Sequence, residues 1–408
     1  MEKALAMVMA GGRGTRMDIL CHRRAKPILP FAGNYHVIDF TLSNCFNSQV
    51  DKVAVLVDYQ RSTMIEYLNQ WNATNNGAGA VSILQPEMGS YCGTADAVYQ
   101  NLGYVKKLGG EKVLILAGDH VYKMDYRKML MFHDQANAEA TVAVIRVPAE
   151  QACRFGTVAA GADSRITKFV EKSSNPQSSL ASMGIYVFNS DFLCNCLTDD
   201  AREPNSPHDF GYAILPRIAQ SNRIFAYEFQ EYWQDIGTIE AYYEANLQLL
   251  KSNPGFTTSG DWPIISGSRG IATLPQNEWG KIVNSLVSPE CEVEGYVENS
   301  ILSPGVRVGR GAKVINSVIM AKTSIGENSI VDRCILDEEV EVGAFCYIGH
   351  RHDIARQSAG ITMLGDNVSL PHHTVIECKS KINPGLRLSE TDARLIPSGS
   401  VISAPLIA

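Results

Sequence analysis

Residues 4–17 read ALAMVMAGGRGTRM, a short apolar run that passes directly into a loop of glycines and arginines. The run over residues 4–10 has the length and composition of a buried β-strand. Glycines let backbone N–H groups approach an anion closely, and arginine side chains suit phosphate oxygens. The stretch therefore predicts an α/β domain that binds a phosphate-containing ligand at the end of its first strand.

Short apolar runs alternate with helical patterns through the first 250 residues, which predicts βαβ units and a largely parallel, Rossmann-like sheet. Strands are expected at 4–10, 53–57, 81–84, 113–117, 141–147 and 184–188. Helices are expected at 62–71, 93–108 and 126–136. Ligands of such sheets bind beyond the carboxyl ends of the strands, where the loop 11–16 and Gly118-Asp119 both lie.

A different pattern occupies the last third of the chain. Aliphatic–glycine pairs recur there at Val308, Ile325, Val342 and Ile348. The first three are 17 residues apart and the last two are six apart. This spacing predicts a hexapeptide-type parallel β-helix, in which three short strands complete each coil and neighbouring coils bury each other's aliphatic side chains. An antiparallel sandwich, which also contains many short strands, is the alternative.

These patterns divide the chain into three expected segments. Residues 1–250 are expected to form the catalytic domain, and residues 282–408 the β-helix. The intervening residues 251–281 are rich in Gly, Pro, Ser and Thr without a clear period, so we expect a linker or an extended crossover.

Composition excludes several classes of protein. The 408 residues carry a formal net charge of −7, which argues against nucleic acid as the main partner. No run of 18 apolar residues occurs, so we expect no membrane span. The ten cysteines form no CxxC pair, and without a signal peptide we expect free thiols in a cytoplasmic protein.

The glycine–arginine loop fits neither of two common nucleotide-binding motifs. Met17 stands where a dinucleotide fingerprint needs its third glycine, and the Lys-Ser/Thr of a Walker loop is missing. Arg13, Arg16 and the nearby Lys26 nevertheless bring several cations next to backbone donors. We interpret the loop as a polyphosphate site, and a solvated basic face is the alternative.

Two aspartates are candidate magnesium ligands. Asp119 follows a strand and a glycine, and Asp235 lies in a second polar segment. Mg²⁺ prefers one or two carboxylates together with phosphate oxygens. The alternative for each is a helix N-cap, for Asp235 before the helical stretch 240–250.

Two further pairs carry both acid and base. Glu171-Lys172 could bind a sugar hydroxyl and a phosphate, although such a pair is also typical of a solvated sheet edge. His208-Asp209 could transfer a proton, or could form a turn around a hydrogen-bonded histidine.

The chain as a whole resembles one family. The motifs that carry the resemblance are GGRGTRM (11–17), RRAKPILPF (23–31), YHVIDFTLSNCFNS (35–48), GTADAVYQN (93–101), AGDHVYKMDY (117–126), FVEKSSNP (169–176), SLASMGIYVF (179–188), HDFG (208–211) and YWQDIGTIEAYYEAN (232–246). Together they resemble the glucose-1-phosphate adenylyltransferases, the ADP-glucose pyrophosphorylases of bacterial glycogen synthesis. This family implies a GT-A-like nucleotidyltransferase domain, a left-handed β-helix and a homotetramer.

The resemblance implies an activity and a set of site residues. The family forms ADP-glucose and pyrophosphate from ATP and α-D-glucose 1-phosphate with Mg²⁺. ATP would contact Gly11, Gly12, Arg13, Gly14, Thr15, Gln85, Gly93 and Thr94. Catalysis would depend on Arg16, Lys26, Asp119 and Asp235, with the two aspartates holding Mg²⁺. Glucose 1-phosphate would contact Tyr91, Gly156, Glu171, Lys172, Ser182, Asp209 and Trp233.

Departures from the family pattern concern regulation and partner choice. Ser90 replaces the tryptophan that the family usually has before Tyr91. The resemblance implies an anionic activator site at Arg23, Arg24 and His36, but the C-terminal tail lacks the family's basic run. Either another activator is used or the response is weak. A nucleotidyltransferase for another base or sugar, a non-catalytic regulatory subunit, and a β-helix acyltransferase remain as alternative functions.

Overall fold

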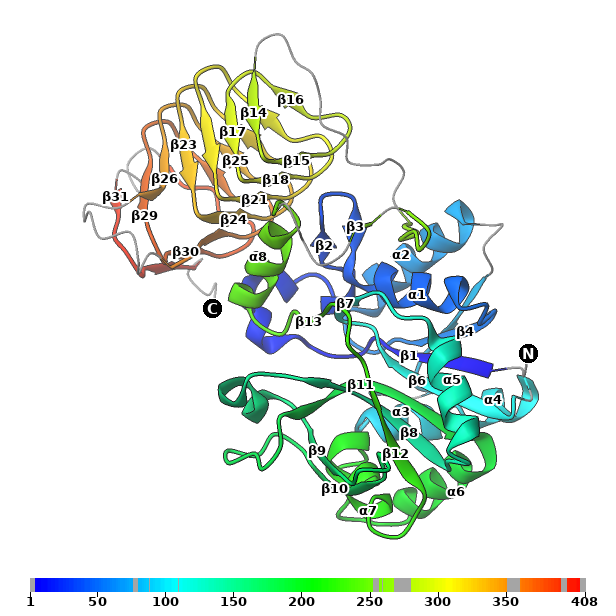
Figure 1. Ribbon diagram of the computed structural model, residues 1–408. Coiled ribbons are helices and arrows are strands. Elements are labelled where there is room, and N and C mark those ends of the chain that lie inside the picture. The colour runs from blue at the N-terminus through cyan, green and yellow to red at the C-terminus, as the bar shows by residue number, and fades with distance from the viewer. Residues whose placement is uncertain are drawn as a thin grey trace. The chain divides into compact units, whose positions relative to one another are not determined.

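The chain forms two units in the computed structural model, which describes residues 4–75, 80–87, 89–108, 110–251, 257–258, 260–267, 280–350, 360–389 and 395–403 (Figure 1). The first unit comprises residues 1–13, 38–233 and 258–267. The second comprises residues 14–37, 234–257 and 268–408.

A nine-stranded mixed sheet forms the centre of the first unit. Its parallel half contains β6 (Lys112–Ala117), β1 (Ala4–Met9), β4 (Lys52–Leu56) and β5 (Val81–Leu84), in that order across the sheet. The other half contains β11 (Leu180–Asn189), β8 (Ala140–Arg146), β12 (Ile224–Glu228), β9 (Thr157–Ala160) and β10 (Ile166–Val170). Here β11 runs antiparallel to β6, β8 and β9, so the sheet is more mixed than the sequence pattern alone predicts.

Helices flank this sheet, and their apolar faces complete a core with its strands. They are α1 (Val37–Asn47), α2 (Arg61–Thr74), α3 (Thr94–Tyr99), α4 (Leu102–Leu108), α5 (Tyr126–Gln135), α6 (Ser190–Ala201) and α7 (Leu215–Ile218). The single helix expected over 93–108 is wrong, because α3 and α4 are separate. Asn101 lies at the break and its side-chain amide donates to Ala97 O at 2.8 Å, a local bond that competes with continuous helix.

The second unit contains a stack of short parallel strands in three sheets. The first contains β14 (Lys281–Val283), β17 (Tyr296–Glu298), β20 (Lys313–Ile315), β23 (Ile330–Asp332), β26 (Tyr347–His350), β29 (Val375–Glu377) and β31 (Leu395–Ile396). The next contains β15 (Leu286–Val287), β18 (Ile301–Leu302), β21 (Val318–Ile319), β24 (Cys334–Leu336), β27 (Thr362–Leu364), β30 (Lys381–Ile382) and β32 (Val401–Ile402). The last contains β16 (Glu292–Val293), β19 (Arg307–Val308), β22 (Ser324–Ile325), β25 (Glu341–Val342) and β28 (Ser369–Leu370).

These coils confirm the parallel β-helix. Val308, Ile325 and Val342 stack in register, so the spacing of 17 is one full coil. The glycines that follow them are required by the stacking. A Cβ on Gly326 would lie 2.5 Å from the carbonyl carbon of Gly343 in the next coil.

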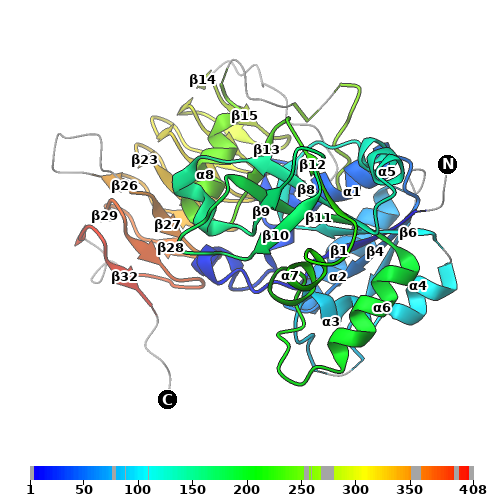
Figure 2. The ribbon, with the colours of Figure 1, turned by 60° about the horizontal axis from the view of Figure 1, so that its bottom comes forward.

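Two segments distant in sequence pack with the coils inside this second unit. The chain at 14–37 forms short turns at Thr15–Cys21 and Lys26–Ile28 and a hairpin of β2 (Pro30–Phe31) and β3 (Tyr35–His36). Helix α8 (Ile239–Gln248) lies along the coils near β21 in both views (Figure 1, Figure 2). Asn246 of α8 accepts a hydrogen bond from Ala32 N at 2.9 Å.

The expected boundaries 1–250, 251–281 and 282–408 stay predictions. When the chain is divided into compact units, the segments 14–37 and 234–257 belong to the unit that contains the β-helix and not to the unit that contains the nine-stranded sheet. Most of the expected crossover, residues 252–256, 259 and 268–279, lies outside the described residues. Among the helices that the structure describes, none has the length and apolar character needed to cross a membrane.

Candidate active site

The glycine loop leaves β1 at the carboxyl edge of the sheet. A Cβ on Gly11 would lie only 2.9 Å from Asp58 Cβ, so the close approach to the neighbouring strand end requires glycine. Gly12 faces open space, and Gly12 and Arg13 are exposed. The backbone at this edge is therefore accessible to a ligand, as the sequence predicts.

Asp119 lies at the same edge, in the bend between β6 and β7 (His120–Tyr122). Its side chain is 34% exposed, and Oδ1 is 3.6 Å from His120 Nε2. The N-cap alternative is wrong, because no helix follows directly. The next helix, α5, is capped by Asp125, which accepts from Arg127 N at 3.0 Å. Asp119 is thus a partly exposed carboxylate whose position capping does not explain.

Glu171 and Lys172 lie beside two glycines. Lys172 Nζ is 3.0 Å from Glu171 Oε1. A Cβ on Gly156 or on Gly211 would lie 2.5 or 2.6 Å from Glu171 Oε2, so both glycines leave room for this carboxylate. Lys172 has φ of +44°. The structure therefore brings three of the predicted sugar-phosphate residues together in the first unit.

Asp209 is engaged in hydrogen bonds on both carboxylate oxygens. Oδ1 accepts from Gly211 N at 2.8 Å and Tyr212 N at 3.0 Å, and Oδ2 accepts from Thr94 Oγ1 at 2.8 Å. Asp209 thereby joins the start of α3 to the short helical turn Phe210–Ile214, which follows Asp209 in the chain. Ser182 N donates to Gly156 O at 2.7 Å, which places Ser182 beside the same cluster.

His208 does not pair with Asp209. Its Nδ1 lies 2.8 Å from Oδ2 of the buried Asp200, and its carbonyl accepts from Ala95 N at 2.8 Å. A Cβ on Gly93 would lie 2.3 Å from this carbonyl oxygen. The interpretation of a turn around a hydrogen-bonded histidine is therefore confirmed over that of a proton-transfer pair.

Aromatic side chains surround Trp233. Its ring packs edge-to-face on His120 with centroids 5.1 Å apart, and on Phe155 at 5.5 Å. In the described part of the chain no hydrogen-bond acceptor reaches the buried Trp233 Nε1. Tyr91 OH accepts from Asn101 Nδ2 at 3.1 Å, and burial raises the pKa of the Tyr91 phenol. Gln85 is exposed, directly after β5.

A second cluster lies in the second unit. Lys26 Nζ is 3.2 Å from Asp235 Oδ1; Lys26 is buried and Asp235 is partly buried. A Cβ on Gly237 would lie 2.7 Å from Asp235 Oδ2 and 3.1 Å from Arg16 Nη2. Gly14 has φ of +60°, and its Cβ would lie 3.2 Å from Lys26 Cβ. Arg16 and Asp235 therefore meet beside Gly237, and Asp235 also pairs with Lys26.

Asp235 is the last residue of β13 (Trp233–Asp235). The alternative that Asp235 is a helix N-cap is therefore wrong, as it is for Asp119. The N-cap of α8 is Thr238, whose Oγ1 accepts from Ala241 N at 3.2 Å. Asp119 belongs to the first unit and Asp235 to the second. Within the described ranges no three His, Cys, Asp or Glu side chains gather as a metal-binding group.

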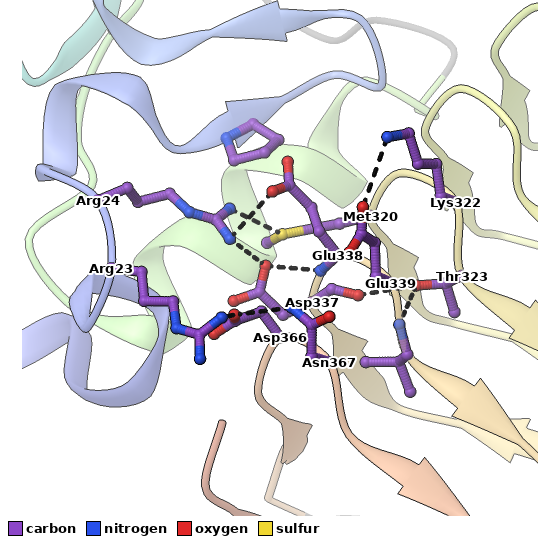
Figure 3. Close-up of polar contacts among 12 residues, drawn as sticks. Arg23, Arg24, Met320, Lys322, Thr323, Asp337, Glu338, Glu339, Asp366 and Asn367 are labelled. Atoms are coloured by element: carbon purple, nitrogen blue, oxygen red, sulfur yellow. Dashed lines mark hydrogen bonds and ion pairs between the residues drawn. The ribbon is translucent and has the colours of Figure 1, made fainter. Parts of the chain in front are cut away.

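The predicted activator residues contact acidic side chains of the β-helix (Figure 3). Arg24 Nη2 lies 2.6 Å from Asp337 Oδ1 and 3.3 Å from Glu338 Oε2, and Arg23 Nη1 lies 2.8 Å from Asp366 Oδ2. Burial and the nearby Arg24 lower the pKa of His36 to about 3, which keeps the imidazole neutral. Carboxylates of the chain itself therefore already neutralise both arginines.

The sequence analysis did not identify Asp58 and Arg61 as candidate site residues. Asp58 lies two residues after the end of β4, which neighbours β1, just as Asp119 lies two residues after the end of β6. Its strand-end position could therefore have identified it. Arg61 begins α2, and its Nη2 lies 2.8 Å from Asp58 Oδ1.

Comparison with known proteins is consistent with this arrangement. Residues 5–252 match the family described as nucleotidyl transferase, and residues 271–368 match the GlmU-like, C-terminal hexapeptide family. A glucose-1-phosphate adenylyltransferase of Desulfitobacterium hafniense is 40% identical over 386 residues, which cover 92% of this chain and 96% of that protein. The enzyme of that name from Acetivibrio thermocellus is 38% identical over 98% of both chains, and the one from Bacillus anthracis is 41% identical over 84% of this chain and 93% of its own.

Proposed function

Because this chain belongs to the nucleotidyl transferases, and among them to the glucose-1-phosphate adenylyltransferase family, we propose that it makes ADP-glucose and pyrophosphate from ATP and α-D-glucose 1-phosphate. The reaction would be the first committed step of glycogen or α-glucan synthesis. Within the structure, the observation that carries this proposal is that Asp235 lies with Arg16 beside Gly237 and also pairs with Lys26.

The chemistry needs positioning and charge more than it needs a general base. The nucleophile is a phosphate oxygen of glucose 1-phosphate, whose second pKa is about 6, as for other phosphomonoesters. That oxygen forms a bond to the α-phosphorus in line with the bond that breaks, and pyrophosphate leaves with the electron pair. Two polyanions must meet, so charge neutralisation and orientation dominate the barrier.

The cations of the second unit suit the leaving group. Arg16 is exposed beside Gly237, and we assign it to the departing pyrophosphate. Lys26 is held by Asp235 and supplies further positive charge. Asp119 and Asp235 are the proposed Mg²⁺ ligands. The ion neutralises phosphate oxygens when it is bound.

The sugar phosphate is assigned to the first unit. Lys172 presents a half-exposed ammonium group for the phosphate, and Glu171 presents a carboxylate for sugar hydroxyls. Asp209 acts on this cluster by fixing Gly211, against which Glu171 packs. Trp233, with its unpaired Nε1, and Ser182 complete the proposed sugar-phosphate residues.

An anionic effector and a homotetramer are further proposals. The Arg23 side chain is 57% exposed, so an effector anion can reach it, but that anion must compete with Asp366. Phe345, Tyr347 and Leu395 are 47%, 40% and 55% exposed on the coils. Apolar surface of this kind favours association of identical chains.

A nucleotide panel tests the proposed function. Pyrophosphate release should be measured with glucose 1-phosphate and Mg²⁺ and, in turn, ATP, CTP, GTP, UTP and dTTP. We expect ATP to be preferred by at least tenfold in kcat/KM. A preference for UTP or dTTP would refute the adenylyl assignment, and no turnover with any nucleotide would favour a regulatory subunit.

A further inference from the structure

Three loops follow the adjacent parallel strands β1, β4 and β5 of the first unit. The outer two are the glycine loop after β1, assigned above to ATP, and the segment after β5, in which Gln85 and Gly93 are assigned to ATP and Tyr91 to glucose 1-phosphate. The middle loop, after β4, carries Asp58 and Arg61, to which no role has been assigned.

Arg61 contacts both its own loop and the segment after β5. Its Nε donates to Asp58 O at 2.9 Å, and its Nη2 lies 2.8 Å from Asp58 Oδ1. The same Nη2 donates to Gly89 O. One guanidinium therefore ties the loop after β4 to the segment that carries Tyr91 and Gly93.

Asp58 contacts the glycine loop on the other side. A Cβ on Gly11 would lie 2.9 Å from Asp58 Cβ, so Gly11 packs directly on this aspartate. The Asp58 side chain is only 16% exposed. An uncompensated carboxylate here would repel a triphosphate on the glycine loop, because Coulomb interactions are stronger where water is partly excluded. The Arg61 guanidinium supplies the compensating charge.

We propose that Arg61 is a positioning residue of the nucleotide site, which holds residues 89–93 beside the glycine loop and cancels the charge of Asp58. This inference rests on the proposed function, because it assumes that ATP binds at these loops. It deepens that function by giving the pair a larger effect on the nucleotide than on the sugar phosphate.

A second ion pair in the chain, Arg127–Asp125, provides a matched control, because it has a structural role and lies outside the proposed nucleotide site. Arg127 Nη2 lies 2.7 Å from Asp125 Oδ2 near the start of α5. The two side chains are 36% and 17% exposed, against 34% and 16% for Arg61 and Asp58. A general effect of losing a helix-start ion pair would therefore appear equally in Arg127→Ala.

The test compares Arg61→Ala, Asp58→Asn, the double variant Asp58→Asn/Arg61→Ala and Arg127→Ala. KM for ATP and for glucose 1-phosphate are measured, together with Kd for ATP by titration calorimetry without the sugar phosphate. We expect Arg61→Ala to weaken ATP binding at least tenfold and to raise KM for glucose 1-phosphate by a smaller factor, because the segment that Arg61 contacts also carries Tyr91. The double variant should bind ATP at least threefold more tightly than Arg61→Ala does. Arg127→Ala should bind ATP as tightly as the wild type.

Two outcomes would overturn the inference. One is an ATP affinity of Arg61→Ala equal to that of Arg127→Ala, and the other is a double variant no better than Arg61→Ala. If Arg61→Ala does not fold, Arg61→Lys, which keeps the charge and loses the two-sided contact, should still weaken ATP binding by more than threefold. A wild-type chain that binds ATP without forming ADP-glucose would refute the proposed function alone, because the calorimetric Kd still reports on Arg61.

Discussion

Lys26 Nζ lies 3.2 Å from Asp235 Oδ1, and the two side chains are 7% and 12% exposed although 209 positions separate them. Losing one partner of a charged contact that is partly buried costs about 1–3 kcal/mol. We therefore expect Lys26→Ala to lower the free energy of unfolding by roughly that amount and to reduce kcat. Urea denaturation measures the first effect. Lys322→Ala is the control, since its pair with Glu339 is exposed, and equal losses in both variants would contradict the account.

The two arginines of the glycine loop should differ in their effect on turnover. Arg16 lies with Asp235 around Gly237, whereas Arg13 ends the part of the loop that belongs to the first unit. Losing one group that stabilises transition-state charge costs about 10²–10³-fold in kcat. We expect a loss of that size for Arg16→Ala and a loss of less than tenfold for Arg13→Ala, measured as initial rates at saturating substrates. Equal, small losses would reduce the loop to a binding surface.

Lys172 should affect the sugar phosphate selectively. Its ammonium group is half-exposed beside Glu171, so its loss removes a charge-assisted contact to phosphate while leaving the fold intact. We expect Lys172→Gln to raise KM for glucose 1-phosphate by at least tenfold with KM for ATP within twofold. Lys168→Gln, an exposed lysine of β10, is the control. A parallel rise in both KM values would show that Lys172 does not select the sugar phosphate.

Much of the fold follows from local patterns in the sequence. The strand expected at 81–84 is β5 itself, and the 17-residue spacing of Val308, Ile325 and Val342 is one coil of the β-helix. Both patterns depend on side chains a few residues apart. The antiparallel half of the sheet, by contrast, depends on which distant strands pair, and no local period reports that.

The site was predictable where it follows strand ends and unpredictable where it depends on tertiary contacts. The glycine loop and Asp119 each come directly after a buried strand. The packing of Glu171 against Gly156 and Gly211 joins segments that no sequence spacing connects. The Arg24–Asp337 pair spans 313 positions, so the family resemblance could suggest an activator site at Arg24 but no sequence spacing could show its carboxylate partner.

Asp337 should make stability depend on pH. Burial raises the pKa of this carboxyl to about 6, more than the Arg24 charge lowers it. The folded protein thus binds the proton more tightly than the unfolded chain does, so the stabilisation is complete below about pH 4 and is lost as pH rises through about 6. Chemical denaturation between pH 4 and 7 should show this decline in the wild type relative to Asp337→Asn, and identical pH profiles would contradict the assignment.

The most direct test of the adenylyl-transfer account uses glucose 1-phosphate labelled with ¹⁸O in all phosphate oxygens, incubated with ATP, Mg²⁺ and the purified chain. Attack of the sugar phosphate on the α-phosphorus predicts that ADP-glucose retains the whole label and that pyrophosphate carries none, as read by mass spectrometry. Label in pyrophosphate, or the absence of ADP-glucose, would contradict the account.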